Sequence, residues 1–200
     1  MIRAATADDP LRVAVLASGR GSNLAALLER LDASARVVAV ASNRADALAL
    51  QRAAEEGIET AVFPAGDDRV ARDRALAAWL RERDVELVVL AGFMEILSAE
   101  VVERLPVVNV HPSLLPAFPG LRAWEQALDA GVAETGVTVH FVDTGLDTGP
   151  VIAQEPVPVR AGDTPAALHE RIQAVEHRLL PEVVRRLAAD RVPAPVEAGA

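Results

Sequence analysis

The sequence contains no cysteine, and this absence excludes several classes of protein at once. Disulfide scaffolds, iron–sulfur clusters, thiolate zinc sites and cysteine nucleophiles all require that side chain. The chain also lacks any run of about 18 consecutive apolar residues, the length that a membrane-spanning helix needs. We therefore expect neither a transmembrane helix nor a membrane partner, and the missing disulfides are compatible with a cytoplasmic protein.

Positive charge is also scarce. Twenty Lys and Arg residues stand against 29 Asp and Glu residues, which gives a net charge of −9. A protein that binds long nucleic acid normally carries a basic face, so nucleic acid is not an expected partner. A small anionic ligand remains compatible with this charge, because a helix N-terminus can bind phosphate locally. The sequence holds no His-Glu-x-x-His motif and no acidic cluster, so we expect no bound metal.

Short apolar runs alternate with helical patterns along the first half of the chain. Four runs without polar alternation predict strands that helices cover on both faces, at residues 12–17, 36–41, 86–91 and 106–110. Helical spacing occupies the intervals between them, at residues 24–31, 45–56 and 69–83. This alternation predicts an α/β fold of the doubly wound, Rossmann type with a mainly parallel sheet.

The second half has a different pattern. A helix is predicted at residues 122–130, and two strands at residues 136–142 and 151–159 predict an antiparallel extension of the sheet. Thr164 followed by Pro165 is typical of a helix start, and it precedes one long C-terminal helix. With 51% hydrophobic residues in 200, we expect a single domain over residues 12–191 and flexible tails at residues 1–11 and 192–200.

A glycine-rich turn, Ser-Gly-Arg-Gly-Ser-Asn at residues 18–23, joins the first predicted strand to the first helix. Its glycines allow close backbone approach to a ligand, and the N–H groups of a helix start attract anions. The turn fits a dinucleotide fingerprint poorly, because Leu24 replaces the third glycine, and it lacks the lysine of a P-loop. Two interpretations stay open: a phosphate cradle for a small substrate, or a plain tight turn with Ser22 as the helix cap.

Asn109 and His111 stand at the end of the fourth predicted strand. Being two residues apart, their side chains lie on the same side of the strand, at the edge where open α/β sheets bind ligands. An amide and an imidazole together can stabilise an oxyanion and transfer protons, so a catalytic pair is favoured over a structural histidine. Asp147 lies in a turn, where it either caps its own backbone or pairs with His111. The other histidines, His140, His169 and His177, are expected to be structural or surface groups.

Four motifs together resemble those of the folate-dependent glycinamide ribonucleotide formyltransferases. They are the turn at residues 18–23, Leu-Ala-Gly-Phe-Met at 90–94, Asn-Val-His-Pro-Ser-Leu-Leu-Pro at 109–116 and Leu-Asp-Thr-Gly-Pro at 146–150. The resemblance covers residues 12–191, and it implies a formyltransferase-like fold in one domain. It also implies formyl transfer from 10-formyltetrahydrofolate to the amine of a ribonucleotide, a step of purine biosynthesis that needs no metal. The expected partners are these small molecules, and the protein is expected to be a monomer or a homodimer.

The resemblance further implies a role for each site residue. Asn109, His111 and Asp147 would be catalytic, with Asp147 favouring a protonated imidazole; Gly21, Ser22 and Asn23 would hold the phosphate, and Glu176 the substrate amine. The folate would contact Arg69, Met94, Glu95, Ile96, Leu97 and Asn109, beneath the loop from Asp143 to Asp147. Residues 12–105 would form the phosphate-binding half, and residues 106–191 the catalytic and folate half. The chain departs from some relatives at Glu95, where they carry a basic residue, and at residues 121–125, which lack a histidine.

Other proteins share part of this pattern. A methionyl-tRNA formyltransferase would be expected to add a basic C-terminal domain, and a formyltetrahydrofolate deformylase an N-terminal regulatory domain. A non-catalytic nucleotide-binding module needs only the glycine turn, which would leave His111 and Asp147 without a purpose. The complete set of motifs therefore favours formyl transfer to a small ribonucleotide.

Overall fold

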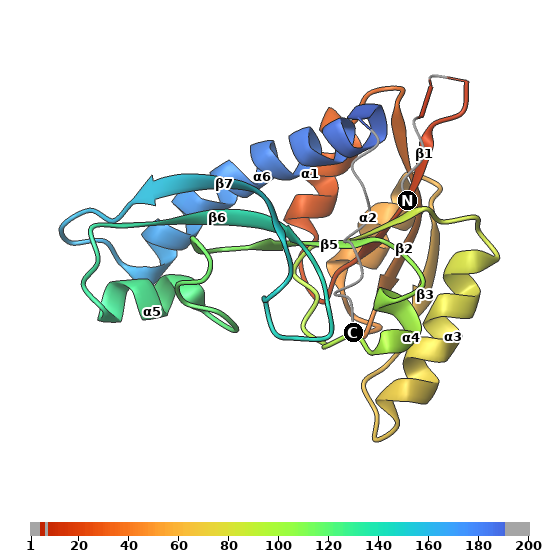
Figure 1. The fold of residues 1–200 in the computed structure, drawn as a ribbon, viewed down its shortest axis with the longest axis horizontal. Helices are drawn as coiled ribbons and strands as arrows, with labels where there is room; N and C mark the ends of the chain where they lie inside the picture. The colour runs from red at the N-terminus through yellow and green to blue at the C-terminus, as the bar shows by residue number, and fades with distance from the viewer. Residues whose placement is uncertain (1–4, 7, 191–200) are drawn as a thin grey trace, which may run out of the picture.

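A seven-stranded sheet runs through the computed structural model, which describes residues 5–6 and 8–190 (Figure 1). The predicted tail at residues 192–200 lies outside the described residues. The strands are β1 (Leu11–Leu16), β2 (Ala35–Ser42), β3 (Glu59–Val62), β4 (Leu87–Leu90), β5 (Val107–His111), β6 (Glu134–Phe141) and β7 (Val151–Pro158). The helices are α1 (Ser22–Arg30), α2 (Leu48–Glu55), α3 (Arg69–Arg81), α4 (Ala99–Val102), α5 (Ala123–Asp129) and α6 (Pro165–Asp190).

The order of strands in the sheet is β3-β2-β1-β4-β5-β6-β7. The first five pair in parallel, whereas β6 runs antiparallel to β5 and β7 antiparallel to β6. The predicted fold class, a mainly parallel sheet with an antiparallel extension, is therefore confirmed. Since the chain moves outward from β1 in one direction and from β4 in the other, the carboxyl ends of these two neighbours form a topological switch point, where α/β sheets bind ligands.

Helices cover both faces of the sheet, and each face has its own apolar core. Leu24 and Leu27 of α1, the small residues of α2 and the apolar stripe of α6 pack on one face. Leu76 and Leu80 of α3 pack with Val101 of α4 on the other. Figure 1 shows α1 and α6 along one side and α3 with α4 along the other. This double cover explains why the central parallel strands consist of continuous apolar runs.

The longest helix, α6, begins where Thr164 accepts a hydrogen bond from the Ala167 N–H at 3.2 Å, as the predicted cap requires. Most of the apolar stripe of this helix is buried, with Leu168, Ile172 and Leu187 fully inaccessible. The helix packs on α1 and β2 and also on α5, β6 and β7. It therefore joins the two halves that the sequence distinguishes, residues 12–105 and 106–191.

The apolar pattern does not predict β3 or α4. β3 is an edge strand that pairs only with β2 and leaves most of its side chains exposed, so it has no apolar run to find. α4 has four residues, too few for a helical period. At the N-terminal side, β1 begins at Leu11, one residue earlier than expected, and the Ala5 N–H donates to the Ala188 carbonyl at 3.0 Å.

Candidate active site

A cavity of about 730 Å³ lies at the carboxyl ends of β1, β4 and β5. Nearly all the predicted site residues line it together: Gly21, Ser22, Asn23, Met94, Glu95, Ile96, Leu97, Asn109, His111, Asp143, Asp147 and Glu176. Arg69 does not line the cavity; it is exposed at the start of α3. Residues far apart in the sequence thus meet at the topological switch point.

The glycine turn enters α1 through Gly21, whose φ of 71° places it in the left-handed region. Gly21 is the N-cap and no side chain caps the helix, so the interpretation of Ser22 as the cap is wrong. The first N–H groups of α1 are therefore available to a ligand in the cavity. Gly21 is also required for packing, because a Cβ there would come within 2.8 Å of the Ala49 Cα on α2.

Two main-chain loops meet beside this turn. Ser18, which follows β1, donates its N–H to the Gly92 carbonyl at 3.1 Å and accepts the Met94 N–H on its hydroxyl oxygen at 2.8 Å. The loop at residues 92–98, which follows β4, is thereby fastened to the glycine turn. The predicted phosphate and folate subsites consequently share one rigid boundary.

His111 is held at both ring nitrogens. Its Nε2 lies 2.9 Å from the Phe118 carbonyl oxygen, and its Nδ1 lies 3.4 Å from Oδ2 of Asp147. A carbonyl oxygen can only accept, so Nε2 carries a hydrogen and Nδ1 is the nitrogen that gains or loses a proton. The predicted pairing of His111 with Asp147 is present, and it involves the titrating nitrogen.

Asp147 makes contacts across the cavity rather than within its own turn. Oδ2 accepts the Gly120 N–H at 2.8 Å, and Oδ1 lies 3.5 Å from Nδ2 of Asn109. The local capping role belongs to Asp143, which accepts from the Gly145 N–H at 2.9 Å and from the Thr148 hydroxyl at 2.7 Å. Asp147 itself adopts a φ of 54°, a conformation that non-glycine residues seldom adopt and that recurs at functional sites.

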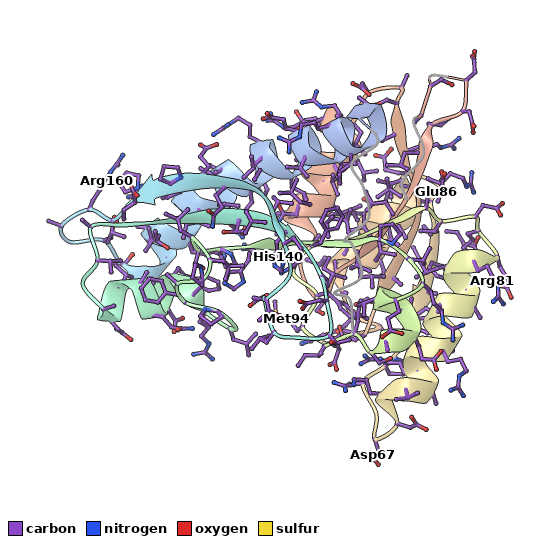
Figure 2. The ribbon with its side chains drawn as sticks, viewed as in Figure 1. Asp67, Arg81, Glu86, Met94, His140 and Arg160 are labelled. Carbon is purple, nitrogen blue, oxygen red and sulfur yellow. The ribbon has the colours of Figure 1, made fainter. Side chains whose placement is uncertain are left out.

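His140 belongs to this group, although the sequence analysis assigned it a structural or surface role. It lies on β6 directly opposite Asn109 of β5, is almost fully buried and lines the cavity. Its Nδ1 contacts the Phe141 carbonyl at 2.7 Å, and its Nε2 lies 3.2 Å from Nδ2 of Asn109 and 3.6 Å from Oδ1 of Asp147. Figure 2 shows His140 and Met94 in the same central region of the molecule.

The charge state of His111 beside Asp147 differs from the protonated imidazole that the resemblance implies. Burial lowers the pKa of His111 below its ordinary value of 6.5, and this effect exceeds the opposite ones of the Phe118 carbonyl and the Asp147 charge. Burial acts to raise the pKa of Asp147, but contacts with His140, the Gly120 N–H and His111 outweigh it and the pKa is lowered. The unliganded site therefore holds a carboxylate beside a mainly neutral imidazole at neutral pH.

Glu176 and Asn23 form a second polar pair, between α6 and α1. Asn23 Nδ2 donates to Oε2 of Glu176 at 2.9 Å, and burial raises the pKa of this carboxyl, whose residue is 6% exposed. Oδ1 of Asn23 is buried without a hydrogen-bond partner among the described residues. An unpartnered acceptor next to a buried carboxyl matches the hydrogen-bond donors of an amine.

Part of the cavity lining is apolar. Met94, Ile96, Leu121 and Leu146 all line it and are at least half exposed. Large apolar side chains gathered in one concave surface are typical of a ligand site, and these would cover a flat ring system. The residues present thus fit a ligand with a polar, anionic end near α1 and an aromatic end near residues 92–98.

Three further lining residues were not predicted as site residues. Trp124 of α5 stacks on His169 of α6, with ring centroids 3.8 Å apart and planes at 4°, and Gln173 lies one turn further along α6. Burial, followed by the charge of Arg20, lowers the pKa of His169. His169, Gln173 and Glu176 follow one helix face at spacings of four and three, the signal that could have found them.

Two further findings concern the described residues 5–6 and 8–190. In this part of the chain no helix is long and apolar enough to cross a membrane. It also holds no group of three or more His, Asp or Glu side chains arranged to bind a metal ion.

The sheet, the uncapped glycine turn at its switch point and the Asn109–His111–Asp147 group are typical of a Rossmann-type enzyme that acts on a small molecule. Comparison with known proteins narrows this class. Residues 11–184 match the formyl transferase family, and the chain belongs to that family.

Individual relatives agree with this assignment. The chain is 46% identical to a phosphoribosylglycinamide formyltransferase of Mycobacterium tuberculosis over 189 residues, 92% of this chain and 87% of the relative. It is 45% identical to the human trifunctional purine biosynthetic protein adenosine-3, but it spans only 19% of that protein. Among solved structures, a glycinamide ribonucleotide transformylase from Symbiobacterium toebii superposes with a TM-score of 0.86 at 46% identity, covering 90% of this chain and 88% of that one. The predicted resemblance is confirmed.

Proposed function

We propose that this protein transfers the formyl group of 10-formyltetrahydrofolate to the amine of 5′-phosphoribosylglycinamide, in the cytoplasmic synthesis of purines. Relatives named for this reaction match about nine-tenths of the chain at 43–46% identity. The observation that carries the proposal is the single cavity that combines a helix N-terminus, a buried carboxyl, the catalytic group and an apolar end.

The proposed substrate positions follow from the polarity of the cavity. The phosphate would lie at Gly21–Asn23, where the helix start offers free N–H groups. The amine would lie near Glu176 and the unpartnered Oδ1 of Asn23. The folate ring would lie against Met94 and Ile96, which places its formyl group toward Asn109 and His111.

In the proposed reaction the amine nitrogen attacks the formyl carbon, and negative charge develops on the formyl oxygen. Asn109 offers this oxygen an amide N–H, since its contact with Asp147 is 3.5 Å long and therefore weak. His111 starts mainly neutral, so the proton that the attacking amine loses can come to lie between its Nδ1 and Oδ2 of Asp147, which are 3.4 Å apart. Asp147 then stabilises the imidazolium, as an adjacent carboxylate does. The bond from carbon to the folate nitrogen breaks, and that nitrogen receives the proton.

A direct test is to incubate the protein with 10-formyltetrahydrofolate, with and without the ribonucleotide. We expect tetrahydrofolate and formylated ribonucleotide to form in equal amounts, and only when both substrates are present. Release of formate without the ribonucleotide would instead identify a deformylase. Absence of any turnover by the folded protein would contradict the proposal.

A further inference from the structure

The loop at residues 92–98 supplies the apolar end of the cavity, and its side chains alternate in environment. Met94 and Ile96 are 59% and 50% exposed toward the cavity, whereas Leu97 is buried in the core under the sheet. The loop has no regular secondary structure between β4 and α4. Its shape must therefore come from contacts with other elements.

Glu95 provides two of these contacts. Its Oε2 accepts from the NH1 of Arg72 on α3 at 2.9 Å, and its Oε1 accepts from Nδ2 of Asn43, which follows β2, at 3.0 Å. The Arg72 side chain is only 7% exposed and that of Glu95 only 25%. The carboxylate therefore spans two elements on either side of the loop, with both of its oxygens engaged.

Arg72 and its neighbour Asp73 hold the loop at two more points. Arg72 NH2 donates to the Ile96 carbonyl at 3.1 Å, and Nε donates to Oδ1 of Asp73 at 2.8 Å. Oδ2 of Asp73, a fully buried residue, accepts the Ser98 N–H at 2.6 Å. The arginine thus lies between two carboxylates, and one of them, Glu95, belongs to the loop itself.

We infer that Glu95 is a positioning residue, which, held by Arg72 and Asn43, keeps the 92–98 loop in the shape that receives the folate ring. This inference rests on the proposed function for the identity of the ligand. It assigns Glu95 an effect on folate affinity through Met94 and Ile96, without requiring its carboxylate to touch the folate.

The substitution Glu95→Gln tests the inference with little change of volume. A glutamine amide carries no charge, so the ion pair with Arg72 is lost even if the Asn43 amide turns to keep its own hydrogen bond. Arg72 keeps Asp73 as its partner, so the fold should remain. The matched control is Glu100→Gln: Glu100 also pairs with an arginine of α3, Arg74 at 3.1 Å, but it lies outside the loop.

Two measurements are made on each variant: hydrogen–deuterium exchange of the unliganded protein, and steady-state kinetics with 10-formyltetrahydrofolate. For Glu95→Gln we expect faster exchange at residues 92–98, a folate KM raised about tenfold, and kcat and ribonucleotide KM within about threefold of the starting protein. Glu100→Gln should change none of these quantities by more than about twofold. In an Arg72→Met background, Glu95→Gln should raise folate KM no further, because its partner is already absent.

Exchange at residues 92–98 that is unchanged by Glu95→Gln would overturn the inference, whatever the activity. So would faster exchange with an unchanged folate KM, since loop shape would then not govern affinity. A lower kcat together with a higher KM for both substrates would indicate general damage rather than positioning. Failure of the proposed function shows itself separately, as an absence of formyl transfer by the unaltered protein.

Discussion

The imidazole of His111 is subject to opposing influences, and their balance decides its charge. Burial favours the neutral ring, while Asp147 favours the imidazolium. An enzyme that takes a proton from an amine benefits from a neutral base that becomes charged only as the reaction proceeds. In the proposed reaction, the charge of Asp147 would therefore be most useful in the transition state, where the imidazolium would form.

The substitution Asp147→Asn tests this role. It keeps the size and removes the charge, so we expect kcat to fall by about a hundredfold or more, within the usual range for general acid–base assistance. The ribonucleotide KM should change only a few-fold. Because Asp147 raises the pKa of His111, its removal should lower that pKa further below 6.5, which a histidine NMR titration would detect.

Circular dichroism serves as the folding control for this variant. A folded Asp147→Asn protein with kcat within about tenfold of the starting value would show that the 3.4 Å contact has no catalytic importance. An unshifted His111 titration would show that the two groups do not interact in solution.

Glu176 would serve the binding of the proposed substrate, but its buried carboxyl lowers the stability of the protein without substrate. We expect Glu176→Gln to raise the free energy of unfolding at pH 7 by on the order of 1 kcal/mol, or about 2–4 °C in Tm. The amide has no carboxyl that must ionise in the buried site, keeps an acceptor for Asn23 Nδ2 and offers a donor to the unpartnered Oδ1. Ribonucleotide KM should rise at least about tenfold, because the amine loses its carboxylate.

The pH dependence of this stability gain has a definite sign. Burial raises the pKa of Glu176 above 4.5, so the folded protein holds this proton more firmly than the unfolded chain. The penalty of the ionised carboxyl is complete above the raised pKa and absent below 4.5. The difference in Tm between Glu176→Gln and the starting protein should therefore vanish as the pH falls through this range. A difference that persists at low pH would contradict the buried-charge explanation.

At the scale of elements, the sequence predicts those strands whose burial on both faces leaves a run of apolar residues. The four central strands are recognisable because helices cover both of their faces. β3 is not recognisable, because it is an edge strand with mostly exposed side chains and is held in the sheet by main-chain pairing with β2. The same limit applies to His140. Its place in the site depends on the pairing of β6 with β5, which brings it opposite Asn109, and this register cannot be read from the local pattern.

The contact between α1 and α2 gives a prediction about Gly21. We expect Gly21→Ala to lower the free energy of unfolding by about 1–3 kcal/mol, measured by urea denaturation, because alanine adopts positive φ unfavourably and its Cβ would meet Ala49. Gly19→Ala is the control from the same turn, where a Cβ would have no neighbour within 4 Å. Equal stability of the two variants would contradict the packing role. Ribonucleotide KM of a Gly21 variant reports packing as well as phosphate contact.

At the scale of the whole molecule, α6 packs on elements of both halves, so we expect the halves to unfold as one unit. Trp79 lies on α3, within residues 12–105, and Trp124 lies on α5, within residues 106–191. We expect the single-tryptophan variants Trp124→Phe and Trp79→Phe each to unfold in urea in one transition, whose midpoint agrees with that from circular dichroism of the same variant. A fluorescence midpoint that differs from the circular dichroism midpoint in either variant would show that the halves unfold independently.

The site was more predictable than its electrostatics. The motifs identified most residues that meet in the cavity, because the turn at 18–23 follows β1, the loop at 92–98 follows β4, and Asn109 and His111 end β5. Glu176 lies on α6 and was expected only from the family resemblance. Arg69 is the exception, since it lies at the start of α3 and away from the lining. The neutral imidazole and the contacts of Glu95 could not be predicted, because burial and the partners Arg72 and Asn43 exist only once the chain has folded.

The two hydrogen bonds of Ser18 have a thermodynamic consequence for the pair of substrates. They join the turn that would hold the phosphate to the loop that would hold the folate, so a shift in either segment changes the other. Linkage requires such coupling to be reciprocal: a factor by which bound ribonucleotide tightens the folate is also the factor by which bound folate tightens the ribonucleotide. Where that factor exceeds one, a rise in the concentration of one substrate would also increase the saturation of the protein with the other.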